Sequence, residues 1–167
     1  LQAGHDEVLK RMRRPYTLAE YRGVVDKVRE RIPDVAITTD IIVGFPGETD
    51  GQFEAALKFV EEMAFSRLHV FRYSPRRGTP AAGFPDQVPT KVKNERSQQM
   101  IQLGKELSRA FHQRFIDGEV EVLWEEAGID GQGDLWQGHT PNYVMVKAYR
   151  RAGSPGDIER VSITGAD

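Results

Sequence analysis

The spacing of hydrophobic residues changes along this chain, and the change divides it into two parts. Up to about residue 116, apolar residues recur mainly at helical intervals, with short β-branched runs between the helical segments. Capping-box patterns at Thr17–Glu20 and Thr49–Gln52 predict the starts of two helices. A long amphipathic segment, residues 92–115, predicts a further helix that stops before Gly118.

Two short segments, 35–43 and 66–73, are typical of strands because they are rich in β-branched and aromatic residues. One of the predicted helices separates them. Strand, helix and strand in this order predict two parallel strands joined by a right-handed crossover. The first part of the chain is therefore predicted to have an α/β fold of the parallel-barrel type.

Strand alternation places a carboxylate on one particular face of this sheet. Ile41 and Val43 point to one side of the first strand, and Asp40 points to the other. The outer face of a parallel barrel packs on helices and is apolar, so Asp40 is predicted to face the barrel interior, where it needs a partner. The same alternation puts His69 and Tyr73 on the surface that carries Asp40. A lone histidine in such a place is more often a satisfied interior side chain than a catalyst.

After residue 116 the apolar residues alternate with polar ones. Runs of period two lie at 120–124, 143–146 and 158–163. Short strands separated by Gly, Asp and Pro turns predict a small antiparallel β-barrel. The predicted domains are therefore 1–116 and 117–167.

Charge follows the same division. Residues 116–167 contain ten acidic and four basic side chains, whereas residues 1–115 contain 15 acidic and 19 basic ones. A polyanionic partner would therefore favour the first part. The whole chain is 39% hydrophobic and 29% charged and has no apolar run long enough to span a bilayer, so we expect a soluble, cytoplasmic protein without membrane contact.

The chain contains no cysteine. Disulfides, thiolate catalysis and cysteine ligation of zinc or of an iron–sulfur cluster are therefore excluded for residues of this chain. His5, His112 and His139 lack metal-ligand spacing, so no metal site is predicted.

The segment Gly44–Thr49 is the first candidate for ligand binding. It lacks the glycine spacing of a dinucleotide-binding turn and the lysine of a P-loop. Its two glycines allow close backbone approach, and the amides at the start of the following helix can bind an anion. The alternative is a tight strand-to-helix turn capped by Thr49.

The second candidate follows the next predicted strand. Arg72, Arg76 and Arg77 flank a rigid Ser-Pro element there. Arginines at a strand end can bind phosphate or carboxylate through paired hydrogen bonds, and the alternative is a solvated loop.

Exposed aromatic residues are a third candidate. Trp124, Trp136 and Tyr143 lie in the C-terminal part. Small barrels often bind nucleic acid by stacking bases on such side chains, whereas core filling is expected of at least one tryptophan.

Taken together, these motifs closely resemble the methylthiotransferase family of radical S-adenosylmethionine enzymes. The resemblance covers essentially the whole chain, and residues from about 117 resemble the family's C-terminal TRAM domain. The matching segments are Leu1–Gly4, Tyr16–Thr17, Thr39–Thr49, His69–Phe71, Tyr73–Arg76, Gly78–Ala81, Gly138 and Asn142–Tyr143.

This resemblance implies the C-terminal portion of a radical S-adenosylmethionine barrel over residues 1–116 and a TRAM domain over 117–167. It also implies an enzyme that uses S-adenosylmethionine and two [4Fe–4S] clusters to add a methylthio group. Most family members modify the adenosine beside the anticodon, so the anticodon region of tRNA is the expected partner. The segment Leu68–Phe71 most resembles the branch that acts on threonylcarbamoyl-adenosine. The isopentenyl-adenosine branch is the alternative.

Carried over residue by residue, the resemblance implies two sets of contacts and no catalytic residue or metal ligand in this chain. The implied cofactor-binding residues are Asp40, Gly44, Gly47, Glu48, Phe71 and Tyr73. The implied substrate-binding residues are Gln2, Ser74, Arg76 and Arg77.

The chain departs from the family in lacking the radical-cluster CxxxCxxC motif and the N-terminal cluster domain. Because the family's cluster ligands are cysteines, both clusters are expected outside this chain, in a missing N-terminal portion of the same enzyme. The chain alone is therefore expected to be inactive, or alternatively to serve as an RNA-binding or structural fragment. Exposed barrel edges would allow copies to associate. Ala3 and His5 stand where the family usually has other residues, so no role is carried over to them.

Overall fold

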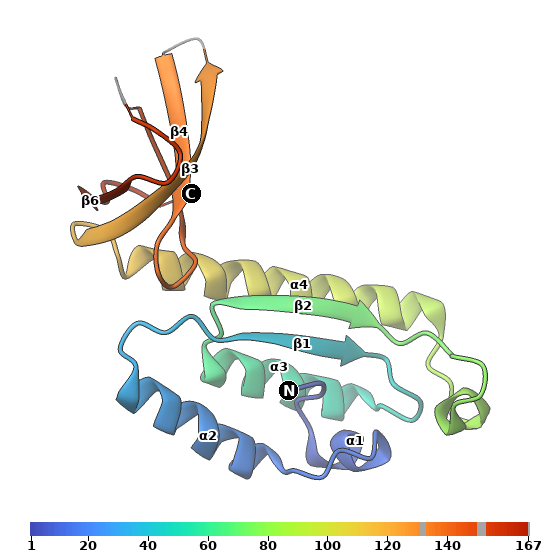
Figure 1. Cartoon of the computed structure of the whole chain (residues 1–167). Helices are drawn as coiled ribbons and strands as arrows, with labels where there is room; N and C mark the ends of the chain where they lie inside the picture. Colours follow the sequence, from blue (N-terminus) through green and yellow to red (C-terminus); the bar gives the residue numbers. More distant parts are fainter. Residues whose placement is uncertain (131–132, 150–152, 167) are drawn as a thin grey trace. The chain divides into compact units, whose positions relative to one another are not determined.

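Two parallel strands, β1 (Thr38–Val43) and β2 (Arg67–Arg72), form the sheet of the first part of the chain (Figure 1). Their register pairs Asp40 with His69. On the other edge of β1, Gln2 forms a parallel bridge with Ile41, and its backbone bonds to the residues on either side of Ile41. The parallel βαβ arrangement predicted from the sequence is confirmed.

Four α-helices and one short 3-10 helix accompany these strands. The Thr17 and Thr49 side chains cap two of the helices, and both predicted capping boxes are present. The long helix begins two residues earlier than predicted. The bounds are α1 Asp6–Arg11, α2 Leu18–Arg31, α3 Asp50–Met63, η1 Pro80–Gly83 and α4 Thr90–Gln113.

One face of the two-stranded sheet is covered and the other is open. Ile41 and Val43 belong to a buried core with side chains of α2, α3 and α4, and Leu68 and Val70 pack against the same core. The opposite side chains, which we call the open face, are exposed except for half-buried Ile42. The open face consists of Thr38, Asp40, Ile42, Arg67, His69 and Phe71. The alternation predicted for both strands is confirmed.

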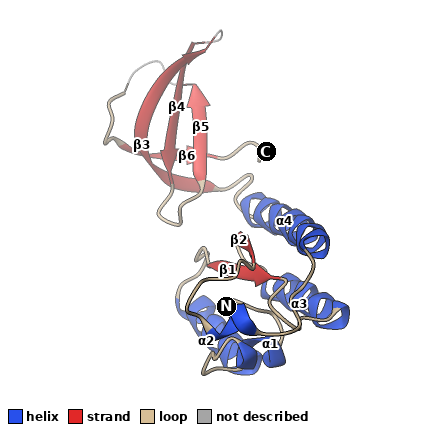
Figure 2. Ribbon diagram, turned by 90° about the vertical axis from the view of Figure 1, so that its right-hand side faces the viewer, coloured by secondary structure: helices blue, strands red, loops and turns tan. Residues whose placement is uncertain are grey.

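Antiparallel strands build the second part of the chain. The spatial order is β5-β4-β3-β6, and Val122, Trp124, Trp136 and Val146 form its buried core (Figure 2). The strands are β3 Glu119–Asp130, β4 Gly133–His139, β5 Met145–Tyr149 and β6 Ile158–Ser162. The predicted antiparallel sheet is thus present, whereas closure into a barrel stays a prediction.

The computed structural model describes residues 1–130, 133–149 and 153–166. They fall into two compact units, Leu1–Ser108 and Arg109–Asp167, so the division lies inside α4 and earlier than the predicted one after residue 116. The last turn of α4 counts with the second unit, where Phe111 is buried and packs edge-on against Phe115. No helix among the described residues is both long and apolar enough to cross a membrane.

Candidate functional site

The candidate site lies on the open face of β1 and β2 and in the segments that follow the two strands. Asp40 and His69 meet there, with 3.1 Å between Asp40 Oδ1 and His69 Nδ1. Both side chains stay about half exposed, at 59% for Asp40 and 49% for His69. Phe71 lies two residues beyond His69 on the same face and is 52% exposed. The open face therefore offers a polar pair and an aromatic surface to a ligand.

Close packing in the turn after β1 explains its glycines. Gly44 and Gly47 have φ angles of 71° and 76°, in the left-handed region that favours glycine. A Cβ at Gly44 would lie 2.2 Å from Cγ of Lys93, so a side chain would collide with α4. At Gly47 a Cβ would lie 3.1 Å from an Arg11 nitrogen.

Four backbone amides of this turn already have partners within the chain, and anion binding by the amides at the start of α3 stays a prediction. Gly44 N donates to Oε2 of Glu48 at 2.7 Å, and Gly47 N donates to the Asp86 carbonyl at 2.7 Å. Glu48 N donates to the Phe45 carbonyl, and Thr49 N donates to the Gln52 side chain. Because these donors have partners within the chain, a bound anion would have to displace them.

Glu48 ties the turn to α4 through a buried ion pair. Its carboxylate is 2.8 Å from Arg96 Nη1, and the two side chains are 4% and 6% exposed. Arg96 also donates to the Glu48 carbonyl and to Asp50 at the start of α3. Burial raises the pKa of the Glu48 carboxyl, while the Gly44 amide and the Arg96 guanidinium oppose this rise. The carboxylate of Glu48, implied to bind cofactor, is therefore engaged inside the protein.

Tyr73 leaves the surface that it was predicted to share with Asp40 and His69. It follows the end of β2, and its ring packs edge-on against buried Phe45, with 5.2 Å between centroids. The Lys93 ammonium donates to its carbonyl. Its hydroxyl oxygen is buried and has no hydrogen-bond partner among the described residues. The Tyr73 hydroxyl therefore lies within the protein and does not face the open face.

The arginines after β2 differ in their contacts. Arg72 donates a hydrogen bond to Asn94 of α4. Arg76 and Arg77 are exposed and have no ion pair within the described part of the chain. Ser74 is exposed beside them. Arg76 and Arg77 are thus free to bind an anionic group.

Gln2 makes no hydrogen bond, within the described part of the chain, to the segment after β2 that carries Arg76 and Arg77. Gln2 is half-buried and lies on the edge of β1 opposite β2, with a left-handed φ of 84°. The implied substrate residues therefore flank the sheet on two sides. Their part in binding remains a prediction.

Sequence reasoning missed Lys93 and Arg96, which fix both candidate segments. They lie three residues apart on α4, and residues at that spacing share a helix face. This spacing was the available indication in the sequence that both cations could act from one face of α4. Nothing local to α4 indicated that their partners lie at Tyr73 and Glu48.

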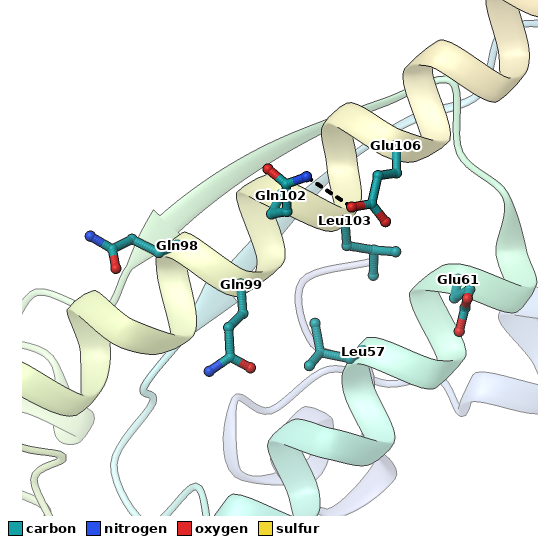
Figure 3. A pocket seen from close by; sticks show the side chains of 7 residues that line it. All are labelled: Leu57, Glu61, Gln98, Gln99, Gln102, Leu103 and Glu106. Atoms are coloured by element: carbon teal, nitrogen blue, oxygen red, sulfur yellow. Dashed lines mark hydrogen bonds between the residues drawn. The ribbon is translucent and has the colours of Figure 1, made fainter.

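A groove between α3 and α4 lies away from these residues. Its volume is about 440 Å³, and Leu57 and Leu103 form its apolar part (Figure 3). Amide and carboxylate side chains supply the rest, and its lining includes no cation or histidine. Those residues are Glu61, Gln98, Gln99, Gln102 and Glu106. This lining does not suit an anionic nucleotide, so the groove is not included in the candidate site.

The aromatic residues of the second unit separate into core and surface. Trp124 is fully buried and Trp136 is 5% exposed, so both fill the core. Tyr143 is 86% exposed and has a left-handed φ of 61° in the turn before β5. Thr140, which is buried, holds this turn through its hydrogen bond from Val144 N. Of the three stacking candidates, only Tyr143 offers its ring to a partner.

The residues present fit S-adenosylmethionine better than they fit a metal cluster. The open face supplies hydrogen-bonding groups and an exposed aromatic ring. Among the described residues, no three histidine, aspartate or glutamate side chains gather in a metal-binding arrangement. With no cysteine in the sequence, the chain has no thiolate ligand for a [4Fe–4S] cluster.

Comparison with known proteins relates the chain to radical SAM enzymes and to tRNA methylthiotransferases. Residues 1–60 match the radical SAM superfamily. The chain is 44% identical over 173 residues to the tRNA-2-methylthio-N(6)-dimethylallyladenosine synthase of Corynebacterium urealyticum, a match that covers 99% of the chain and 31% of that protein. It is 40% identical over 167 residues to the threonylcarbamoyladenosine tRNA methylthiotransferase MtaB of Bacillus subtilis, covering 99% of the chain and 37% of that protein.

A third relative is the Thermotoga maritima MtaB enzyme, which is 49% identical over 125 residues, 75% of the chain and 29% of that protein. The chain thus spans about a third of the length of the curated relatives it matches.

Proposed function

Because this chain is related over 99% of its length to tRNA methylthiotransferases of the radical SAM superfamily, we propose that it forms part of such an enzyme in the cytoplasm. The reaction is addition of a methylthio group to a modified adenosine beside the anticodon of tRNA. The observation that carries this proposal is the match at 40–44% identity to enzymes of both substrate types.

The open face forms one side of the S-adenosylmethionine site in this proposal. Asp40 and Phe71 contact the cofactor there, and Tyr73 supports the segment after β2 by packing against Phe45. Gly44, Gly47 and Glu48 act by holding the turn after β1 in place, since their amides and carboxylate are engaged within the chain. When bound, S-adenosylmethionine supplies the radical chemistry of the superfamily.

RNA is bound by the exposed groups around this face. Arg76 and Arg77 bind phosphate, with Ser74 beside them, and Gln2 lies at the opposite edge of β1. Both [4Fe–4S] clusters are held by cysteines outside this sequence, so the 167 residues alone are inactive.

We propose threonylcarbamoyl-adenosine as the substrate. This choice is supported by the 49% identity to the Thermotoga maritima enzyme and by the resemblance of the segment Leu68–Phe71 to the branch that acts on this nucleoside. Dimethylallyl-adenosine, also called isopentenyl-adenosine, is the second candidate, supported by the 44% identity to the Corynebacterium urealyticum enzyme.

A chimera tests the proposal. The matching stretch of the Bacillus subtilis enzyme is replaced by this chain and expressed in a strain that lacks both methylthiotransferases. Mass spectrometry of tRNA nucleosides is expected to show methylthio-threonylcarbamoyl-adenosine. A second chimera, built on the Corynebacterium urealyticum enzyme, serves as the control for the other substrate. Activity of only the second chimera would reverse the substrate assignment, and two folded but inactive chimeras would reject the function.

An RNA-binding or structural fragment is the alternative for the isolated chain. The free cations Arg76 and Arg77 favour weak RNA binding, and the edge of β2 that has no strand partner among the described residues favours pairing between copies. Gel shifts of an anticodon stem-loop at low and high salt test the first, and light scattering tests the second. No shift at low salt together with a clean monomer would exclude both.

A further inference from the structure

The contact between Asp40 and His69 has chemical consequences that neither residue has alone. Asp40 and His69 are register partners on neighbouring parallel strands, so both side chains project from the same face of the sheet. With 59% and 49% of their side chains exposed, the pair contributes on the order of 0–1 kcal/mol to stability. Stability is therefore a weak reason for this geometry.

The contact with Asp40 determines which nitrogen of the His69 imidazole carries the proton. An ionised carboxylate can only accept hydrogen bonds, so His69 Nδ1, at 3.1 Å from Asp40 Oδ1, must carry a proton. In the neutral imidazole this leaves Nε2 as an acceptor, opposite to the tautomer that histidine favours in water. Asp40 thus acts on the imidazole at one nitrogen and sets the chemistry of the other.

The surroundings of His69 indicate what this acceptor would bind. Phe71 is 52% exposed on the same face, and Arg67 is exposed two residues before His69. An exposed ring beside an oriented acceptor suits an aromatic base that stacks and carries a hydroxyl or amine donor. Adenosine has all these features, and it occurs both in S-adenosylmethionine and in RNA.

We propose that Asp40 is a positioning residue that holds His69 in the Nδ1-protonated tautomer, and that His69 Nε2 accepts a hydrogen bond from the adenosine portion of a ligand on the open face. The identity of the ligand rests on the proposed function, whereas the tautomer rests on the geometry alone. His69 thereby joins the binding residues, and Asp40 acts through it as well as by direct contact.

Nitrogen NMR of the 15N-labelled chain tests the tautomer. At pH 8.5, His69 is expected to show protonated Nδ1 and bare Nε2, and to lose this pattern in Asp40→Ala. His139, whose Nδ1 lies 2.8 Å from Glu125 in the second unit, is the internal control and keeps its pattern in that variant. A protonated Nε2 at His69 in the unmodified chain would overturn the positioning role. So would an unchanged His69 pattern in a folded Asp40→Ala variant.

Titrations with two probes test the ligand. S-adenosylhomocysteine and an anticodon stem-loop are each added to the labelled chain while the Nε2 signal of His69 is followed. A shift with S-adenosylhomocysteine assigns the acceptor to the cofactor, and a shift with the stem-loop assigns it to RNA. His69→Ala is expected to weaken binding of that probe at least fivefold, and His139→Ala is expected to leave its affinity unchanged. No shift with either probe would overturn the ligand assignment even if both chimeras were active.

Discussion

Gly44 shows how a single residue can be required for packing at a position where binding was expected. Its left-handed φ of 71° and the approach of Lys93 to its missing Cβ leave room only for hydrogen. Its amide is taken by Glu48. The glycine is therefore needed for the turn to pack closely against α4. The position of this turn then fixes the end of β1.

Substitution of this glycine is expected to be costly. Gly44→Ala should lower the free energy of unfolding by about 1–3 kcal/mol, because it adds a clash and a strained φ. Gly23→Ala is the matched control, since Gly23 lies within α2 and a Cβ there meets nothing within 4 Å. It should raise stability by up to about 1 kcal/mol. Urea unfolding measures both, and equal effects would contradict this account.

At the scale of elements, α4 holds the candidate site together although it carries none of the residues implied to bind ligand. Arg96 fixes the turn after β1, and Lys93 bonds to the Tyr73 carbonyl after β2. One helix thereby sets the positions of both segments. Changes on α4 should accordingly affect the site from outside it.

Removal of the buried charge on Glu48 tests this anchoring. Glu48→Gln leaves Arg96 buried without its main counter-charge and should cost about 3 kcal/mol of stability. Glu62→Gln, which alters the exposed pair with Arg22, should cost no more than about 1 kcal/mol. Thermal or urea unfolding of the two variants gives the comparison. A loss at Glu48 as small as that at Glu62 would show that the buried pair does not anchor the turn.

The capping box of α2 predicts a dependence on pH. Hydrogen bonds from the Thr17 amide and hydroxyl lower the pKa of the Glu20 carboxyl. A lowered folded-state pKa gives stability that is present above the unfolded value, near 4.5, and is lost as the pH falls through the folded value. Glu20→Gln can keep the cap but cannot titrate. The stability advantage of the unmodified chain over Glu20→Gln should therefore shrink on acidification below pH 4.5, and an advantage that grows would refute the linkage.

Local and periodic features were predictable from the sequence, and long-range ones were not. Strand alternation and both capping boxes were confirmed because neighbouring residues determine them.

Strand β4 was not predicted. On the inner face of this strand Trp136 is followed by Gly138, which has no side chain and so weakens the apolar alternation. That glycine is required because a Cβ there would lie 2.2 Å from the Leu123 carbonyl of β3. The Asp130-Gly131 pair, typical of hairpin turns, was the missed signal.

The same limit applied to the candidate site. Alternation and parallel pairing predicted that Asp40 and His69 share a face, and the register of the two strands then brings them into contact. The occupation of the turn amides and of the Glu48 carboxylate was not predicted, because Arg96 lies 48 residues further along the chain. Tyr73 also escaped prediction, since alternation stops where β2 ends and packing against Phe45 takes over.

At the scale of the whole molecule, two units with separate cores make up the described chain. Both tryptophans lie in the core of the second unit, whereas most helical residues belong to the first. Tryptophan fluorescence and far-ultraviolet circular dichroism therefore report different units. Gly44→Ala is expected to shift the helical transition and to leave the fluorescence transition in place. Equal shifts of both transitions would show that the units unfold together.

The central claim is that the open face of β1 and β2 binds S-adenosylmethionine beside an RNA-binding loop. Its most direct test is the affinity for S-adenosylmethionine and the turnover of the active chimera and of its Asp40→Ala and Arg76→Ala variants. Lys91→Ala, at an 88% exposed side chain, is the control and should change neither quantity. We predict at least tenfold weaker cofactor binding in Asp40→Ala and slower tRNA modification in Arg76→Ala. Unchanged affinity and turnover in both variants would contradict the assignment of this face as the ligand site.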